Sequence, residues 1–441
     1  MDHILGLKCT VCGAEYAPGE VEYVCPKHGN EGILDVIYDY RRVAERLGPQ
    51  SLRASLDRSI WRYLPLLPVD PGVASRLVPG TTLSSVGWTP LLPVPRLADA
   101  LGLRHLWVQD DSRQPTGSFK DRASAIAVVK AGELRSQVIT TASTGNAAAA
   151  LAGLCAAVGQ PNVIFVPRTA PEAKVAQLLA YGAQVLLVDG SYGQAFELCL
   201  QAAPRFGWYN RNTGYNPYMS EGKKTAAYEI CEQLAESTGT LGRAPLPAPD
   251  VVFVPVGDGC IIGGLHKGLR DLAALGWIAK MPRLIGVQAA GSSPLVATWE
   301  EHCRGVRLGA QDVTQIALDM APVDAHTLAD SISAGLPRDR IKALRAVVET
   351  GGAYIRVSDP QILAAIPALA QGCGVFAEPA AAAAYAGLVQ AVQDKLVAPD
   401  DCIVVLSTGS GLKDARAAIR ATNSPPVIAP ELAAVERALD M

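Results

Sequence analysis

Two kinds of apolar pattern alternate along this chain from about residue 103 onward: short continuous runs and segments with helical spacing. Short runs such as NVIFVP (162–167) and VVFVPVG (251–257) have the length and β-branched composition of buried strands. Segments with apolar residues at helical spacing, such as PEAKVAQLLAYG (171–182), lie between these runs. This alternation predicts parallel sheets covered by helices on both faces. The expected strands are 103–109, 137–143, 162–167, 183–190, 251–257, 283–290, 353–358 and 402–409, and the expected helices are 118–131, 146–158, 171–182, 192–206, 262–275 and a last surface helix within 424–441.

The length of 441 residues exceeds what one hydrophobic core supports, so at least two domains are expected. The proline-rich stretch GTLGRAPLPAPD (239–250) has the composition of a connection between domains. We therefore predict the α/β class, with two domains built on open, mostly parallel twisted sheets. The expected units are a Cys-rich N-terminal element at 1–37, a large domain formed by 38–125 and 240–441, and a small domain at 126–239.

Charge and hydropathy argue against nucleic-acid and membrane partners. The chain has 39 basic and 42 acidic residues and a net charge of −3, so it has no basic field for nucleic acid or an anionic membrane. Its longest nearly uncharged stretches, NAAAALAGLCAAVG (146–159) and PAAAAAYAGLVQAV (379–392), are shorter than the ~18–20 residues of a membrane span. The N-terminus lacks the layout of a secretory signal, and we expect a cytoplasmic location.

Four potential metal ligands cluster near the N-terminus. Cys9, Cys12, Cys25 and His28 form two short pairs separated by a dozen residues, which is the spacing of a zinc knuckle, and Gly13 permits a tight turn after the first pair. The alternative is a ribbon that keeps this shape without metal. In both cases the role is structural, because four protein ligands leave no open position for water.

One lysine occupies an unusual position in QPTGSFKDRASA (114–125). Lys120 follows a turn-rich stretch and precedes Asp121, a residue that suits the start of a helix. A lysine at a helix N-terminus faces an unfavourable dipole, which lowers its pKa and favours the free amine. A free amine can form a Schiff base. The alternative is an ordinary solvated lysine on the first turn of a helix.

In open parallel sheets, ligands bind beyond the carboxyl ends of the strands, so the loops after strands are the segments to inspect. In ASTGN (142–146), Ser143, Thr144 and Gly145 would direct amides and hydroxyls at an anion, and Asn146 would add a neutral donor. The alternative for this loop is a simple helix cap.

Two further loops after strands are rich in glycine. VGDGCIIGG (256–264) is not a dinucleotide fingerprint, because Ile262 takes a required glycine position, but its glycines form a nest of amides suited to one phosphate. Asp258 would repel a phosphate, so we expect its side chain to point away. In LSTGSGLKD (406–414), the neutral hydroxyl of Thr408 suits a pyridine nitrogen.

Pyridoxal 5′-phosphate carries an aldehyde, a phosphate and an aromatic nitrogen, and so would use all of these loops. The segments PTGSFKDR (115–122), STGN (143–146), EGKKT (221–225), FAEPA (376–380) and STGSGLKD (407–414) resemble the fold-type-II pyridoxal-phosphate enzymes. Within that group the chain is most similar to the threonine synthases, in order from about residue 84 to 415. The N-terminal Cys-rich element also resembles one found in many of them.

The resemblance implies a role for each matching residue. Lys120 would be the Schiff-base lysine and proton shuttle, Phe119 would line one face of the cofactor, and Asn146 would contact the phenolic oxygen. Thr408 would contact the ring nitrogen. The cofactor phosphate would lie on Gly257, Asp258, Gly259, Cys260 and Ile261, the substrate carboxylate on Ser143, Thr144 and Gly145, and a second anion site among Arg113, Arg211, Lys223 and Lys224.

The activity implied is that of a carbon–oxygen lyase acting on phosphates, converting O-phospho-L-homoserine and water to L-threonine and phosphate. A homodimer is usual for the resembled family. Gln114, Ala123, Trp88, Asp258, Cys260 and Ser410 depart from the family pattern. Two alternatives stay open for that reason: an ammonia-lyase or cysteate-synthase-like enzyme, and a non-catalytic amino-acid-binding paralogue. Retention of Lys120 argues against the paralogue.

Overall fold

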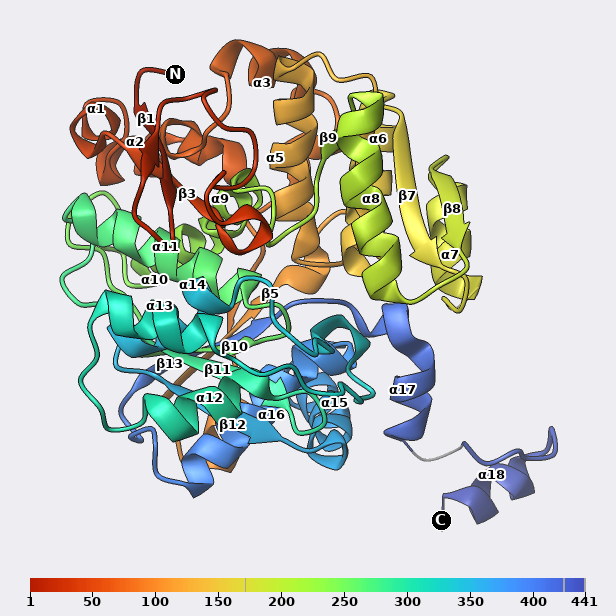
Figure 1. The fold of residues 1–441 in the computed structure, drawn as a ribbon. Helices are drawn as coiled ribbons and strands as arrows, with labels where there is room; N and C mark the ends of the chain where they lie inside the picture. The colour runs from red at the N-terminus through yellow and green to blue at the C-terminus, as the bar shows by residue number, and fades with distance from the viewer. Residues whose placement is uncertain (171, 423–424, 440–441) are drawn as a thin grey trace.

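The computed structural model describes residues 1–170, 172–422 and 425–439, which form three sheets and the helices around them (Figure 1). A six-stranded sheet has the order β12-β11-β10-β13-β5-β4, and a four-stranded sheet has the order β8-β7-β6-β9. The third sheet, of order β2-β1-β3, is formed by the N-terminal residues. The strands are β1 (Ile4–Cys9), β2 (Glu15–Tyr16), β3 (Leu34–Tyr38), β4 (Leu91–Pro93), β5 (His105–Asp110), β6 (Ile139–Ala142), β7 (Asn162–Pro167), β8 (Gln184–Val188), β9 (Tyr209–Asn210), β10 (Val251–Pro255), β11 (Arg283–Ala289), β12 (Ala353–Val357) and β13 (Cys402–Ser407).

The helices lie between the strands as the sequence pattern predicts. Those expected at 146–158 and 192–206 begin and end at the predicted residues, and the one expected at 118–131 starts at Lys120 instead. Pro171, the predicted first residue of another helix, lies outside the described residues, as do 424 and 440–441. The α-helices are α1 (Tyr40–Ala44), α2 (Pro49–Ala54), α3 (Pro71–Leu77), α4 (Pro95–Leu101), α5 (Lys120–Glu133), α6 (Asn146–Val158), α7 (Glu172–Ala180), α8 (Tyr192–Phe206), α9 (Tyr218–Lys223), α10 (Thr225–Ser237), α11 (Cys260–Ala274), α12 (Pro294–His302), α13 (Ala310–Leu318), α14 (Arg340–Glu349), α15 (Asp359–Cys373), α16 (Pro379–Gln393), α17 (Ala415–Arg420) and α18 (Leu432–Ala438), and short 3-10 helices include η4 (Asp111–Arg113) and η5 (Asp330–Ile332).

The six-stranded sheet is buried on both faces, which explains the unbroken apolar runs of its strands. Along β10, Val251 and Phe253 point into the core beneath α15 and α16, whereas Val252 and Val254 point into the opposite core beneath α10, α11 and α14. All its strand pairs are parallel except β4–β5, an antiparallel edge that the sequence pattern did not predict. The predicted α/β class with covered parallel sheets is confirmed.

The four-stranded sheet is entirely parallel and carries helices on both faces. Phe165 of β7 packs with Phe196 of α8 on one face, and Ile164 packs with Ala148 and Ala152 of α6 on the other. The two larger sheets fall within the predicted small and large domains, although the boundaries of those domains stay a prediction. Among the described helices, none has both the length and the hydropathy that a membrane crossing requires.

One buried guanidinium joins the segments that surround Lys120. Arg122 on the first turn of α5 donates from Nε to Asp111 (2.8 Å), and its two terminal nitrogens donate to the two carboxylate oxygens of Glu229 on α10 (2.5 and 2.7 Å). The same nitrogens also donate to Thr225 and Thr89. All five donors are used within the protein, which is what a buried arginine requires.

Helix α9 lies very close to α5 because residue 222 is a glycine. A Cβ atom at Gly222 would lie 2.0 Å from the backbone oxygen of Arg122. On the other side of α9, a Cβ at Gly264 of α11 would lie 2.8 Å from the Cβ of Lys223. These two close approaches bring Lys223 into the space between α5 and α11.

We expect Gly222→Ala to lower the thermal unfolding midpoint by several degrees, because an overpacked contact costs about 1–3 kcal/mol and each kcal/mol shifts the midpoint of a large domain by about 2–4 °C. Gly193→Ala in α8 is the control, since its Cβ would meet only Ser191 Oγ at 3.8 Å. Calorimetry of both variants checks this. Equal midpoints would show that the α5–α9 contact tolerates an added methyl group.

Candidate active site

A cavity of about 550 Å³ opens beyond the carboxyl ends of strands from both large sheets. It is lined by segments that follow β6, β7, β9 and β10, together with Lys120 at the start of α5 and the loop after η5. In open parallel sheets, ligands bind at this position. The loops that the sequence singled out at 143–146 and 257–261 both lie in its wall.

The turn before Lys120 is fixed by its own side chains. Asp121 accepts hydrogen bonds from the backbone N–H of Thr116 (2.7 Å) and from the hydroxyl of the same residue. Gln114 donates to Asp111 (2.8 Å), the carboxylate that also binds Arg122. The polar residues around Lys120 therefore hold the backbone that presents the lysine.

Lys120 lines the cavity with an amine that is easily deprotonated. Burial lowers the pKa of Lys120, and the charge of Arg211 lowers it further, against the opposing effect of Cys260, Glu378 and Asp258. The direction agrees with the one predicted from the helix dipole, but its largest cause is burial. A lysine of this kind suits imine chemistry and proton transfer.

The Lys120 loop lies beside the loop that follows β13. The backbone N–H of Phe119 donates to the oxygen of Thr408 (2.9 Å), and Ser118 pairs with Gly409 in an antiparallel bridge. Both Phe119 and Thr408 are buried, and neither lines the 550 Å³ cavity itself. The structure thus brings Thr408 next to the lysine across nearly 290 residues of sequence, as the resemblance implied.

Helix α11 presents free amides to the cavity. Its N-cap is Gly259, with φ of +85°, and no side chain caps the helix. Among the described residues, the backbone N–H groups of Gly259, Cys260 and Ile261 have no hydrogen-bond acceptor. Asp258 turns one carboxylate oxygen towards the backbone N–H of Arg338 (3.3 Å). An uncapped helix N-terminus with free amides is a ready anion site.

The 143–146 loop has an additional partner that sequence reasoning did not assign to the site. Asn146 Nδ2 donates to Glu378 Oε1 (2.7 Å) at the start of α16, and burial raises the pKa of Glu378. Glu378 lines a second cavity of about 490 Å³, which shares Thr144, Gly145 and Asn146 with the first. The FAEPA motif was the available signal, but it gave no reason to single out its carboxylate.

Two buried cations face the cavity without a carboxylate partner. Lys223 and Arg211 are each 1% exposed, and neither forms an ion pair within the part of the chain that the structure describes. Arg211 donates to the hydroxyls of Ser124 and Thr213. Burial lowers the pKa of Lys223 to about 8 and that of Arg211 to about 10. Unpaired buried cations are costly, so their presence indicates an anionic ligand.

Arg113 and Lys224 are not brought to this cavity. The Arg113 side chain is 68% exposed and pairs with Asp110 (3.2 Å). Lys224 is fully buried on the opposite side of α9, where its ammonium pairs with Glu221 (2.6 Å) and Asp271 (2.8 Å). Of the four candidate cations, Lys223 and Arg211 line the cavity.

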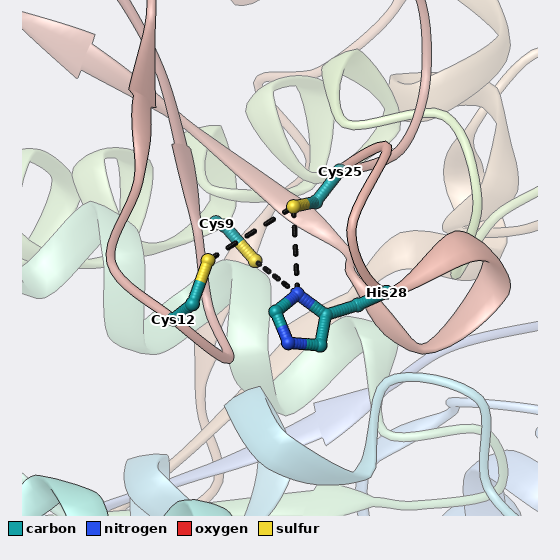
Figure 2. Close-up of side chains that lie close together, drawn as sticks. All are labelled: Cys9, Cys12, Cys25 and His28. Carbon is teal, nitrogen blue, oxygen red and sulfur yellow. Dashed lines mark hydrogen bonds between the residues drawn. The ribbon is translucent and has the colours of Figure 1, made fainter.

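The four predicted metal ligands converge in the N-terminal sheet, defined here as residues 1–38 with β1, β2 and β3 (Figure 2). Their ligand atoms all lie within 4.8 Å of one another, and Cys25 Sγ lies 3.5 Å from His28 Nδ1. Zinc bonds of about 2.0–2.3 Å in a tetrahedron place ligands about 3.5–3.8 Å apart, so this donor set fits the ion. Gly13 has a φ of +71°, as a tight turn after the first pair requires.

Residue for residue, these groups match an aldehyde-bearing, phosphorylated cofactor bound at the edge of an α/β sheet: a buried amine, free helix amides and a hydroxyl behind the lysine loop. Residues 82–409 match the family described as "Pyridoxal-phosphate dependent enzyme", and the chain belongs to this family of enzymes.

Relatives with a specific activity in their names match over almost the full length. The chain is 36% identical to the threonine synthase of Methanosarcina acetivorans and 34% identical to that of Methanocaldococcus jannaschii, with 98% of each chain covered in both cases. It is 36% identical to the threonine synthase of Mycobacterium bovis over 80% of this chain and 89% of that one.

Solved structures share the fold at lower identity. Diaminopropionate ammonia lyase from Escherichia coli has a TM-score of 0.62 at 18% identity, covering 81% of this chain and 94% of that chain. Threonine deaminase isoform 2 from Solanum lycopersicum has a TM-score of 0.60 at 20% identity, covering 76% and 88%. The predicted fold class is therefore confirmed by structure comparison as well.

We expect the affinity of the pyridoxal-phosphate-loaded enzyme for inorganic sulfate to fall as pH rises through about 8. Lys223 carries its charge below a pKa of about 8 and loses it above, whereas sulfate keeps its charge throughout. Titrations between pH 6.5 and 9.5 measure this. In Lys223→Met the affinity should be weaker and flat over that range, and a variant that kept the wild-type pH dependence would assign it to another group.

Proposed function

We propose that this enzyme converts O-phospho-L-homoserine and water to L-threonine and phosphate. The observation that carries the proposal is the pair of buried, unpaired cations, Lys223 and Arg211, in the same cavity as the free amides of α11. A cavity with both features offers separate places for a cofactor phosphate and a substrate phosphate. The full-length similarity to relatives named threonine synthase supports the same reaction.

The cofactor site follows from the residues described above. Lys120 Nζ would hold the aldehyde carbon of pyridoxal phosphate, and the amides of the 257–261 loop would hold its phosphate. Asn146 would donate to the phenolic oxygen once it exchanges its bond to Glu378, and Thr408 would meet the ring nitrogen from the adjacent loop. Phe119 is wholly buried, and its ring lies under the guanidinium of Arg122. It would support the lysine loop on the side that faces the cofactor ring.

When bound, the cofactor draws electrons from the substrate and makes its α-carbon acidic. Lys120 Nζ would accept the proton from Cα and give it up to the cofactor-bound substrate before accepting one from Cβ, since burial favours its uncharged form. The Ser143–Gly145 loop holds the substrate carboxylate on hydroxyls and amides at the N-terminus of α6. Lys223 and Arg211 would hold the γ-phosphate and stabilise its charge as the bond between Cγ and oxygen breaks. The proton taken from Cβ would be returned at Cγ, and Cα would regain its proton from Lys120. Water would add its hydroxyl at Cβ, and its remaining proton would pass to the released phosphate.

Incubating the enzyme with O-phospho-L-homoserine should release inorganic phosphate and L-threonine in equal amounts. Lys120→Ala should lower the rate by more than about a thousandfold, because it removes both the covalent attachment and the proton carrier. Lys130→Ala, at the far end of α5, is the control and should keep most of the activity. Ammonia and a 2-oxo acid from serine or threonine, or a β-replacement product from O-phosphoserine, would instead assign the enzyme to a different reaction of the same cofactor.

We also propose that the N-terminal sheet binds one structural Zn²⁺ through Cys9, Cys12, Cys25 and His28, which the spacing of the ligand atoms supports. The resemblance further supports a cytoplasmic homodimer. The division into a large domain (38–125 and 240–441) and a small domain (126–239) is supported by the separation of the six-stranded sheet from the four-stranded sheet.

Protein purified without added metal should contain about one zinc per chain by elemental analysis. Cys12→Ser should lose most of it, because the tetrahedral donor set is then incomplete. The matched control is Cys155→Ser, a buried cysteine on α6 that is far from the cluster in sequence and should leave the zinc content unchanged. Full retention of zinc by Cys12→Ser would place the metal elsewhere.

A further inference from the structure

The N-terminal sheet contacts the chain immediately beside both buried cations of the cavity. Tyr38, the last residue of β3, donates its hydroxyl to Glu221 Oε2 (2.6 Å) on α9, two residues before Lys223. Tyr23 accepts the backbone N–H of Asn210 (3.0 Å), the residue before Arg211. These are two separate contacts made by one small element.

At the Tyr38 contact, the neighbour of Lys223 is enclosed on several sides. The Lys224 ammonium lies 3.9 Å from the centre of the Tyr38 ring and pairs with Glu221 and Asp271. Glu221, Lys224 and Asp271 are all fully buried. Because consecutive residues on a helix point in different directions, fixing Lys224 towards the N-terminal sheet directs Lys223 towards the cavity.

At the Tyr23 contact, the packing is aromatic as well as polar. The Tyr23 ring lies 5.1 Å from that of Tyr215 and 6.0 Å from that of Tyr209, measured between centroids. The segment 209–215, which carries Arg211, therefore packs against one side chain of the N-terminal sheet, that of Tyr23.

Two more lysines attach β3 to α11, which lines the cavity, and to α14, which packs against α11. Lys267 of α11 donates to the backbone oxygen of Val36 (2.8 Å), and Lys342 of α14 donates to that of Leu34 (2.9 Å). Lys342 also packs against α11, since a Cβ at Gly263 would lie 2.9 Å from its Cβ. The edge of β3 that does not pair with β1 thus aligns three helices, α9, α11 and α14.

We propose that the N-terminal sheet is a positioning element for the substrate's anion site, with Tyr38 and Tyr23 as positioning residues for Lys223 and Arg211. This rests on the anion-binding part of the proposed function. The sheet contacts the segments that carry the two cations on the side away from the cavity. Lys223 and Arg211 therefore keep their positions, without a carboxylate partner, until the anion binds. Loosening either contact weakens anion binding without altering the chemistry at Lys120.

The test is the dissociation constant of inorganic phosphate for the pyridoxal-phosphate-loaded enzyme at fixed pH. Tyr38→Phe removes only the hydroxyl that Glu221 accepts, and Tyr23→Phe only the acceptor of the Asn210 N–H. Each should weaken phosphate binding about three- to tenfold, the effect of about one hydrogen bond. If O-phospho-L-homoserine is the substrate, its kcat/KM should fall by at least the same factor, because the same two cations stabilise the leaving phosphate.

Tyr63→Phe is the matched control. Tyr63 is also buried, and its hydroxyl donates to Glu232 on α10. Glu232 forms a buried ion pair with Arg62. It should cost similar thermal stability and leave phosphate affinity unchanged. The proposal is overturned if the Tyr38 and Tyr23 variants bind phosphate as the wild type does, or if the control weakens binding equally. If Tyr38→Phe does not fold, the phosphate affinity of Tyr23→Phe alone tests the proposal.

Phosphate binding is measured without turnover. The test of the N-terminal sheet therefore holds even if the substrate is not O-phospho-L-homoserine.

Discussion

The position of the reactive lysine depends on a guanidinium that never meets solvent. Arg122 joins the 3-10 turn after β5, the start of α5, the loop before β4 and helix α10, and each of its donors has an acceptor. Removing one member of such a buried set leaves uncompensated charge, which costs about 3–5 kcal/mol. Lys120 is two residues from Arg122 on the same helical turn. The ion pairs and hydrogen bonds of Arg122 therefore also fix the backbone position of Lys120.

Close helix packing then determines which cations reach the cavity. Glycines at 222, 264 and 268 let α9 lie between α5 and α11 at distances that a side chain would forbid. Lys223 faces the ligand space as a result, and Lys224 faces a pair of carboxylates. Two adjacent lysines of one motif therefore have different surroundings: Lys223 lines the cavity, and Lys224 is paired with buried carboxylates.

Most of the architecture was predictable because strands of covered parallel sheets are short, apolar and bounded by small residues. The same logic predicted the post-strand loops at 143–146 and 257–261. It did not distinguish Lys223 from Lys224, since a six-residue helix has no usable periodicity and the outcome depends on packing against α11. Glu378 was missed because its partner, Asn146, is 232 positions away in the sequence. The β4 edge was missed because three residues carry too little pattern.

The N-terminal sheet is synthesised well before several of the residues that it contacts. Lys342 reaches the backbone of Leu34 across 308 positions of sequence. At synthesis rates of roughly 5–20 residues per second, this interval lasts on the order of 15–60 s. During that time the outer edge of β3 is an unpaired strand, which is a known site of unwanted association. The nascent chain must therefore protect this edge through its own small fold, or through a chaperone, until the C-terminal half emerges.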